Sequence, residues 1–227
     1  MIKLTKIIGR NLQEFLERHI LGGLIHKTMW RFRHLYVKDW SLKYLNTVKD
    51  PHRLQISKMV TSFKCVNTVL DIGCASGANT AQLRNFLPNA RLTGIDINPS
   101  GIEFAMRYFA SVNDNKVNFI VKDLTKLTDF SGNSFDVVFT DAVLMFITPN
   151  DIDQVIKSFI RIAKQGIVLN EYHKQDLDGD FFDGGRWVYD YVSLFKKHCP
   201  SAKIEIEKSV FSGGSWDKYG SLIKISL

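Results

Sequence analysis

The stretch VLDIGCASGANT, residues 69–80, decides the fold of this chain because an apolar strand runs through small residues into a helix. A second apolar run, Leu92–Ile95, ends at Asp96, nineteen residues beyond Gly77. In parallel α/β sheets, glycines after the first strand let the backbone approach a nucleotide closely. An acidic residue that ends the second strand can accept both ribose hydroxyls. The two segments therefore predict a pocket for a nucleoside.

Strands and helices alternate along the chain on both sides of this loop. We expect strands at 69–72, 91–95, 117–121, 135–140, 166–169, 203–207 and 221–227, and helices at 78–86, 98–110, 151–163 and 187–198. This alternation predicts an α/β fold with a doubly wound, mostly parallel seven-stranded sheet. No helix separates the last two strands, so we expect an antiparallel C-terminal hairpin at one edge.

The first quarter of the chain has a helical pattern. Apolar residues recur at helical spacing before residue 22, an aromatic and basic segment follows at 29–45, and Pro51 opens a helix over 51–63. The first of these helices carries Leu4, Ile8, Leu12, Phe15, Leu16 and Ile20. We expect a basic helical N-terminal cap over residues 1–63 and a Rossmann-like domain over residues 64–227.

The positive charge is concentrated in this N-terminal region. Residues 1–60 carry 12 Lys+Arg against 4 Asp+Glu, while the rest of the chain carries 18 against 19. Two interpretations remain open: an anionic partner such as nucleic acid, an acidic lipid surface or an acidic small molecule, and a solvated helical face. Three scattered cysteines give no disulfide framework, which favours a cytoplasmic protein. No apolar run is long enough to span a bilayer.

The glycine loop does not have the dinucleotide pattern. Its spacing is Gly73-x-Ala75-x-Gly77, with Thr80 where a third glycine would fall. Asp71 precedes the loop, and a carboxylate there would repel a pyrophosphate but could hold a cationic amino group.

At this loop and four further segments the chain resembles the class I S-adenosylmethionine-dependent methyltransferases. The resemblance covers residues 65–227 and rests on VLDIGCASG at 69–77, GIDINP at 94–99, VKDL at 121–124, FDVVFTD at 135–141 and GIVL at 166–169. It implies a Rossmann-like catalytic domain with S-adenosyl-L-methionine as cofactor. One position departs from the family: Ala75 stands where glycine is usual, and its methyl group is tolerated if φ is negative there.

The resemblance also implies roles for the matching residues. Asp96 would hold the ribose hydroxyls, Ile97 would pack on adenine, and Asp123 and Leu124 would bind its amino group and ring. The expected cofactor site comprises Asp71, Gly73, Cys74, Ala75, Gly77, Asn79, Asp96, Ile97, Asp123, Leu124, Asp141 and Ala142. Arg53 is a candidate partner for the methionine carboxylate.

Fewer sequence motifs indicate the methyl acceptor. The loop after the fourth strand, TDAVLMF at 140–146, has neither the proline-rich motif of amino-methylating nucleic-acid enzymes nor a Pro-Cys nucleophile. Asp141, Asn170 and Glu171 imitate a metal-dependent pattern only loosely, and we expect no metal site. Candidate catalytic residues are His173, as a general base near neutral pH, together with Tyr172 and Asp141.

An acceptor site is expected between the cap and the segment after the fifth strand. Residues 176–187 have the composition of a mobile acidic lid with glycine hinges. The expected substrate-binding residues are Trp30, Arg33, Tyr36, Trp40, Trp187 and Tyr189. We therefore expect methyl transfer to a small, anionic or sugar-like metabolite. Two alternatives stay open: an RNA-directed methyltransferase that uses the basic N-terminal region, and a non-catalytic cofactor-binding interaction module.

Overall fold

A seven-stranded sheet forms the centre of the computed structural model, which describes residues 12, 15–16, 23–177, 180–183 and 185–227. Its strand order is β3-β2-β1-β4-β5-β9-β8. The strands are β1 (Thr68–Ile72), β2 (Arg91–Asp96), β3 (Val117–Val121), β4 (Phe135–Asp141), β5 (Ala163–Tyr172), β8 (Lys203–Lys208) and β9 (Gly220–Ser226). Strands β1 to β5 are parallel, and β9 runs antiparallel to both β5 and β8. The predicted sheet is confirmed, with β9 inserted between β5 and the edge strand β8.

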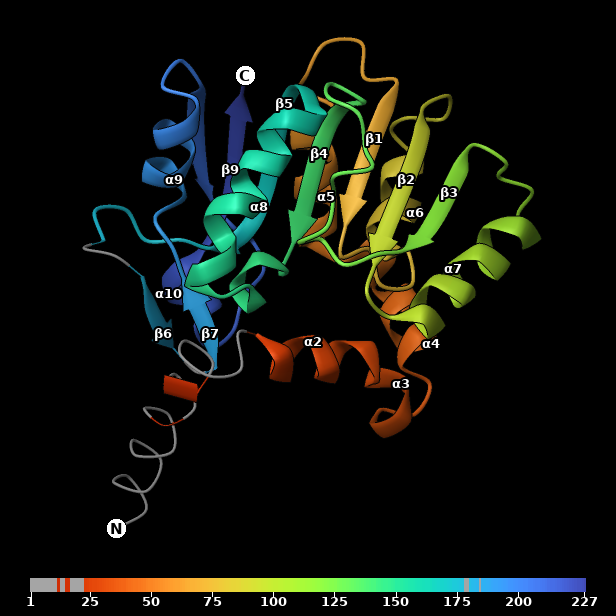
Figure 1. Ribbon diagram of the computed structural model, residues 1–227. Coiled ribbons are helices and arrows are strands. Elements are labelled where there is room, and N and C mark those ends of the chain that lie inside the picture. Colours follow the sequence, from red (N-terminus) through yellow and green to blue (C-terminus); the bar gives the residue numbers. More distant parts are fainter. Residues whose placement is uncertain (1–11, 13–14, 17–22, 178–179, 184) are drawn as a thin grey trace.

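Helices cover both faces of the sheet, because side chains on successive strand residues point to opposite sides. One face packs against α5 (Pro51–Val60) and α6 (Ala78–Arg84), and α7 (Pro99–Ser111) covers Phe119 of β3. The other face packs against α8 (Pro149–Ile162) and α9 (Tyr191–His198). Figure 1 shows α8 in front of the strands and α5 behind them. Strand β4 is buried along its whole length, as its nearly all-apolar sequence predicts.

Three short helices lie beyond the carboxyl ends of the parallel strands: α2 (Leu24–Arg31), α3 (Arg33–Tyr36) and α4 (Trp40–Leu45) (Figure 1). A 3₁₀ turn, η2 (Asn46–Lys49), joins them to α5. Although the predicted cap extends to residue 63, α5 packs on the sheet through Ile56 and Val60. The helix expected from Leu4 to Ile20 lies largely outside the described residues. Among the helices that the structure describes, none is long and apolar enough to cross a membrane.

The segment after β5 differs from the prediction. Strands β6 (Phe181–Asp183) and β7 (Arg186–Val188) form a two-stranded antiparallel sheet where we expected an acidic lid and the start of a helix. The predicted helix over 187–198 therefore begins at Tyr191, where the Asp190 carboxylate caps it by accepting the Ser193 N–H. Trp187 belongs to β7 and is fully buried, so this part of the chain is held by the core.

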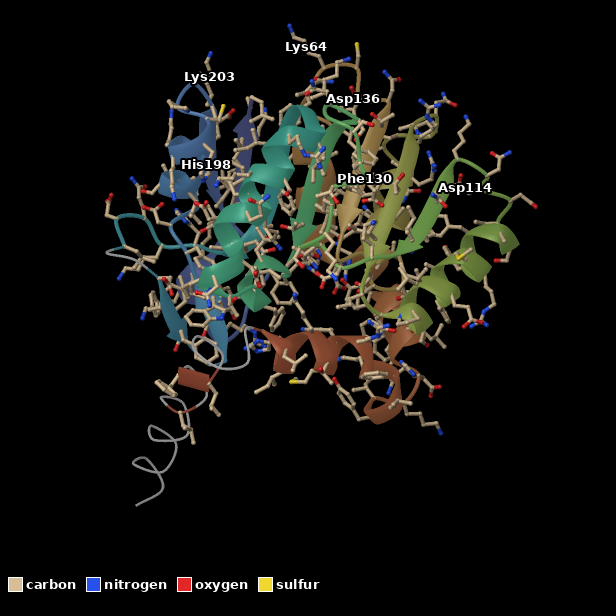
Figure 2. The ribbon with its side chains drawn as sticks, in the orientation of Figure 1. Lys64, Asp114, Phe130, Asp136, His198 and Lys203 are labelled. Carbon is tan, nitrogen blue, oxygen red and sulfur yellow. The ribbon has the colours of Figure 1, made fainter. Side chains whose placement is uncertain are left out.

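The opposite end of the sheet has its own buried carboxylate. Asp136 lies at the amino-terminal edge, far from the cap helices (Figure 2). It accepts hydrogen bonds from the backbone N–H groups of Asn67 and Thr68 at 2.8 and 3.0 Å and from the Thr68 hydroxyl. These bonds lower the pKa of Asp136 although burial opposes them. Asp136 therefore fixes the start of β1 and takes no part in the site.

Candidate active site

A pocket opens at the carboxyl ends of β1, β2 and β4, where open α/β sheets bind their ligands. Its empty space measures about 830 Å³, including the part open to solvent. Strand ends and the loops after them form one wall, and the cap helices α2 and α4 form the other. The lining residues are His26, Lys27, Trp30, Trp40, Tyr44, Gly73, Ala75, Ile95, Asp96, Ile97, Lys122, Asp123, Leu124, Asp141, Ala142, Val143, Phe146 and Ile147.

Asp96 ends β2 with its carboxylate fixed by the backbone. One oxygen accepts the Ala75 N–H and the other accepts the Asn98 N–H, both at 2.8 Å. Burial raises the pKa of Asp96, and these N–H groups, with that of Ile97, partly offset the rise. A carboxylate has about four lone-pair positions, so it retains acceptor capacity for a ribose diol. The Asp96 carboxylate is therefore fixed at the pocket wall with acceptor positions to spare.

The glycine loop follows a left-handed path at three positions. Gly73, Ala75 and Gly77 have φ values of +76°, +52° and +85°. A Cβ atom at Gly73 would lie 2.3 Å from Cγ2 of Val143, so only glycine fits there. The condition for tolerating the methyl group of Ala75, a negative φ, is not met, and in this left-handed conformation its N–H donates to Asp96. Left-handed backbone costs an alanine roughly 1 kcal/mol relative to glycine.

We therefore expect Ala75→Gly to stabilise the protein or leave its stability unchanged, within about 1 kcal/mol. The removed strain favours the variant, whereas the greater freedom of glycine in the unfolded chain offsets part of that gain. Chemical denaturation of both proteins measures the difference. Gly73→Ala is the matched comparison and should lose stability, because the added methyl group meets Val143. A large loss in Ala75→Gly would contradict the strained conformation.

Asp141, at the end of β4, is the centre of a buried polar network. It accepts hydrogen bonds from the side-chain amides of Asn79 at 2.9 Å and Asn170 at 2.7 Å. Nε2 of His52 lies 3.4 Å from the carboxylate and Nη1 of Arg53 lies 3.3 Å from it. Burial alone would raise the pKa of Asp141, but the contacts with His52, Arg53 and Asn79 hold it at about 2. The carboxylate is therefore ionised and is a poor proton acceptor.

Asp71 lies beneath the pocket with one oxygen lacking a partner. Its Oδ2 accepts the Thr80 hydroxyl at 2.7 Å, whereas Oδ1 is buried with no hydrogen bond. Burial is the main reason that the pKa of Asp71 rises to about 7. The buried Oδ1 atoms of Asn79 and Asn170, both bonded to Asp141 through their amide nitrogens, also lack partners. These acceptor oxygens fit the N–H donors of an amino-acid ammonium group, as S-adenosylmethionine carries.

Asp123 stands at the other end of the pocket, beside the cap. The Lys27 ammonium lies 3.3 Å from its carboxylate, and Thr125 donates to it through its N–H and its hydroxyl at 2.9 and 2.8 Å. Burial opposes the shift, but the Thr125 and Lys27 contacts lower the pKa of Asp123. The sequence predicted Asp123 but not Lys27, whose position depends on how α2 folds across the strand ends.

Aromatic side chains of the cap cover the pocket. Trp30 packs 6.4 Å from Trp40 and 5.2 Å from Phe146, measured between ring centroids. Besides the contacts of Lys27, hydrogen bonds attach the cap to the sheet side: the Asn98 amide donates to the Trp30 carbonyl at 2.9 Å, and the Ser76 hydroxyl donates to the Ser41 carbonyl at 2.7 Å. The cap thus encloses an apolar space above the strand ends.

Eight of the twelve expected cofactor residues line this pocket: Gly73, Ala75, Ile97, Leu124, Asp96, Asp123, Asp141 and Ala142. The other four, Asp71, Cys74, Gly77 and Asn79, lie behind the wall and shape it. Cys74 is buried against Gly94, in keeping with a packing role. Trp30 and Trp40 line the pocket as expected of substrate-binding residues, whereas Arg33 stacks over Trp30 and Tyr36 faces outward.

The residues expected after β5 lie in the core. Tyr172 packs against Trp216, and Trp187 packs against Phe182. His173 is buried; the Tyr191 N–H donates to its Nδ1 at 3.2 Å. Tyr189 donates its hydroxyl to the Ile147 carbonyl. None of these four side chains that we expected to touch the acceptor lines the pocket.

Glu171 has a structural role that the sequence did not reveal. Its carboxylate accepts the N–H groups of Val143, Leu144 and Met145 at 2.8 to 3.3 Å. Burial raises the pKa of Glu171 to about 7 despite these bonds. Glu171 thereby holds the loop after β4 that carries Val143 and Phe146 into the pocket. The described residues contain no group of three or more His, Cys, Asp or Glu side chains placed to bind a metal ion.

Comparisons with known proteins agree with this fold. Residues 69–166 match the family model of a methyltransferase domain. The chain is 28% identical over 149 residues to a malonyl-[acyl-carrier protein] O-methyltransferase of Bacillus anthracis, covering 64% of this chain and 53% of that protein. It is 30% identical over 100 residues to ribosomal RNA small subunit methyltransferase G of Mycoplasma capricolum, covering 44% of this chain and 43% of that protein.

Among solved structures, the chain resembles an O-methyltransferase from a trans-AT PKS multienzyme of Brevibacillus brevis in complex with S-adenosyl-L-homocysteine. The TM-score is 0.60 at 16% identity, with 82% of this chain and 78% of that chain covered. The chain spans between a third and about half of the length of the first curated relatives that it matches, from 33% to 53%. Its residues 69–166 form a methyltransferase domain, and its fold is that of the class I S-adenosylmethionine-dependent methyltransferases.

Proposed function

We propose that this protein transfers a methyl group from S-adenosylmethionine to a small-molecule acceptor. One observation carries the proposal: Asp96 of the strand wall and Trp30 and Trp40 of the cap line the same pocket. The carboxylate suits a ribose, and the enclosed aromatic space suits a small acceptor beside it. A folded RNA would need an open, basic groove at this edge, which the aromatic cap covers.

Each end of the cofactor has a matching group in the chain. When bound, S-adenosylmethionine would supply an electrophilic methyl group: an acceptor lone pair would form a bond to the methyl carbon as the opposite C–S bond breaks, and S-adenosylhomocysteine would leave. Asp96 would orient the ribose, and Asp123 would accept from the adenine amino group. Asp71 would accept from the ammonium group. Arg53, the candidate partner for the methionine carboxylate, does not line the pocket and pairs with Asp141 instead. Phe146 and the cap tryptophans exclude water from the reacting atoms.

The pocket wall favours an acceptor that bears an acidic or polar group on an apolar body. Lys27 and Lys122 also line the pocket, but they pair with Asp123 at 3.3 Å and Asp129 at 2.6 Å, toward the end assigned to adenine. The Arg186 guanidinium lies 5.8 Å from the ring centroid of Phe146. The name of the Bacillus anthracis relative indicates a malonyl group methylated on oxygen, which is likewise an acidic acceptor. We therefore infer an anionic or sugar-like metabolite as acceptor, with oxygen as the methylated atom.

His26 is the imidazole that faces the acceptor side of the pocket. It is 4% exposed and packs 5.3 Å from the Phe146 ring. Burial lowers the pKa of His26, a backbone hydrogen bond with Gly185 opposes the change, and Arg186 adds to it. The ring is therefore neutral at neutral pH and can accept a proton from an acceptor hydroxyl. As pH falls through this lowered pKa, the ring becomes protonated and the rate should decrease.

We expect His26→Gln to lower turnover about 100-fold while the affinity for S-adenosylhomocysteine stays within about twofold. Glutamine keeps a polar side chain of similar reach but cannot take up the proton. Initial rates of methyl transfer, measured for both proteins over a range of pH, test the effect. The decrease in rate at acidic pH should be present in the parent and absent in His26→Gln. His173→Gln is the matched control. If His173→Gln loses turnover and His26→Gln does not, the base lies after β5, as the sequence alone suggested.

Methyl transfer itself is tested with S-adenosylmethionine labelled in its methyl group. The purified protein is incubated separately with a pool of small metabolites and with total RNA, and the label is followed by mass spectrometry. The proposal expects label in one or a few small acids or sugars and none in RNA. Label in RNA, lost at raised salt, would favour the RNA-directed alternative. Cofactor binding without label in either pool would favour the non-catalytic module.

A further inference from the structure

The outer side of the cap helices exposes an unusual number of large apolar side chains. Six of the sixteen exposed large hydrophobic residues in the described part of the chain fall between residues 24 and 42. They are Leu24, Met29, Phe32, Leu35, Tyr36 and Leu42, and we call them the cap face. Leu24 and Leu35 are 57% and 73% exposed. Figure 1 shows α2 and α3 beyond the strand ends, at the outer limit of the described chain on that side.

The pocket does not explain these residues. Along α2, His26 and Trp30 are four residues apart and face the pocket. Leu24, Thr28 and Arg31 recur at helical spacing on the exposed side of the same helix. An apolar side chain at Leu24 therefore covers no part of the site. Exposed groups of this size mark an interaction surface in soluble proteins.

Cations are interspersed with the apolar residues of the cap face. Arg31, Lys38 and Lys43 are exposed within the same segment, and Asp39 is its single acidic residue. Arg31, Lys38 and Lys43 form no ion pair with another residue that the structure describes. Their charge is thus available to an anionic partner.

We propose that the cap face docks on the anionic surface of a lipid bilayer. Amphipathic helices with basic residues beside Leu, Phe and Met lie in the interface of a bilayer. Their apolar side chains then sit below the headgroups, and their cations lie among the phosphates. The long Lys side chains can reach headgroups while their methylene groups stay beside the apolar residues. The proposal stands on the outer surface of the cap and does not depend on methyl transfer.

Two other anionic partners match the surface less well. The side chains of Leu24, Leu35 and Leu42 cannot form hydrogen bonds or ion pairs with phosphates or base edges. Bound RNA would therefore leave them exposed to water. The cores of protein interfaces are depleted of charged residues, whereas here cations lie between the apolar residues. A bilayer surface satisfies both kinds of side chain at once.

The test is co-sedimentation of the full chain with vesicles of phosphatidylcholine alone or with about one third phosphatidylglycerol. We expect binding to the anionic vesicles that weakens as salt is raised, and little binding to neutral ones. Phe32→Ser with Leu35→Ser should weaken binding at least about tenfold, because two apolar side chains no longer enter the bilayer. Arg31→Glu with Lys38→Glu should weaken it about 30-fold or more.

Two control variants carry the same types of substitution at exposed residues outside the cap face. Met106→Ser with Val112→Ser alters two exposed apolar residues of the α7 region, and Lys58→Glu with Lys126→Glu alters two exposed lysines. All four double variants should bind S-adenosylhomocysteine as the parent does, which shows that they fold.

Three results would overturn the proposal. One is absence of vesicle binding by the parent protein, and a second is undiminished binding by both cap-face variants. The third is that the cap-face variants keep vesicle binding but lose a dimer or RNA binding that the parent protein shows. Loss of a dimer would assign the cap face to a second copy of the chain, and loss of RNA binding would assign it to RNA.

Discussion

Replacing Asp141 by alanine is expected to lower the free energy of unfolding by about 3–5 kcal/mol, the largest effect of any substitution in this site. Asp141 lies in a buried network with Arg53, which is only 3% exposed. Without the carboxylate, the guanidinium keeps its stacking 4.6 Å from the Tyr44 ring but loses its buried counter-charge. The amides of Asn79 and Asn170 lose their acceptor at the same time. Urea denaturation of parent and variant measures the loss.

The pH dependence of this loss has a definite sign. The pKa of Asp141 is lowered to about 2, so its contribution to stability is present above the ordinary aspartate pKa of 3.8. It is lost as the pH falls through about 2, where the folded carboxylate takes up a proton. The difference in stability between parent and Asp141→Ala should therefore shrink in strong acid.

A surface aspartate with several cationic partners provides the control. Asp153 lies 3.1 Å from Lys157, 2.7 Å from Lys197 and 2.8 Å from His198, but it is far more exposed than Asp141. Because water and salt screen such pairs, Asp153→Ala should cost no more than about 1 kcal/mol. Equal losses in the two variants would contradict the assignment of Asp141 to a buried network in which it is the counter-charge of Arg53.

Replacing Asp96 by alanine is expected to weaken binding of S-adenosylhomocysteine by about 1.5–3 kcal/mol, which is roughly ten- to 150-fold. The variant removes a charged acceptor with two ribose hydroxyls as expected partners. It also leaves the N–H groups of Ala75 and Asn98 without an acceptor, so the glycine loop loses an anchor. Calorimetric titration measures the affinity, and denaturation of the same samples separates the loss of binding from a loss of folding.

Asp114 provides the matched comparison for Asp96. It is a carboxylate outside the pocket that pairs with Arg84 at 2.6 Å. Asp114→Ala should leave the affinity unchanged. An Asp96→Ala protein that is folded and binds as tightly as the parent would refute the ribose assignment.

The sheet was predictable because most strands have an apolar run of their own between turn residues, and β8 alternates Ile with charged residues. Strand β4 is nearly all apolar and is buried along its whole length, as expected. The hairpin of β6 and β7 was missed, although FFDGGRWV at 181–188 places two glycines between apolar pairs, which is a hairpin signal. We interpreted those glycines as hinges. The first predicted helix, before residue 22, lies largely outside the described residues and stays a prediction.

The strand side of the pocket was also predictable, because the ends of neighbouring parallel strands meet at one edge. Asp96 follows from this rule and Asp123 from the resemblance to the methyltransferases, and the structure places both on the pocket wall. His26, Lys27 and Tyr44 could not be assigned, because their positions depend on how the cap folds across the strands.

The left-handed backbone at Ala75 and the position of His173 were not predictable from sequence. The first depends on a hydrogen bond to Asp96 across the loop. The second depends on how far β5 extends: it continues to Tyr172, which carries His173 past the pocket and into the core.

The central claim is that the pocket binds S-adenosylmethionine, and calorimetric titration of the purified chain with S-adenosylhomocysteine tests it most directly. NADH serves as the control ligand, because it shares the adenosine group but adds a pyrophosphate that Asp71 would repel. We predict one site per chain with a dissociation constant in the micromolar range and no heat with NADH. The claim would be contradicted if the protein binds NADH. It would also be contradicted if the folded protein binds neither NADH nor S-adenosylhomocysteine.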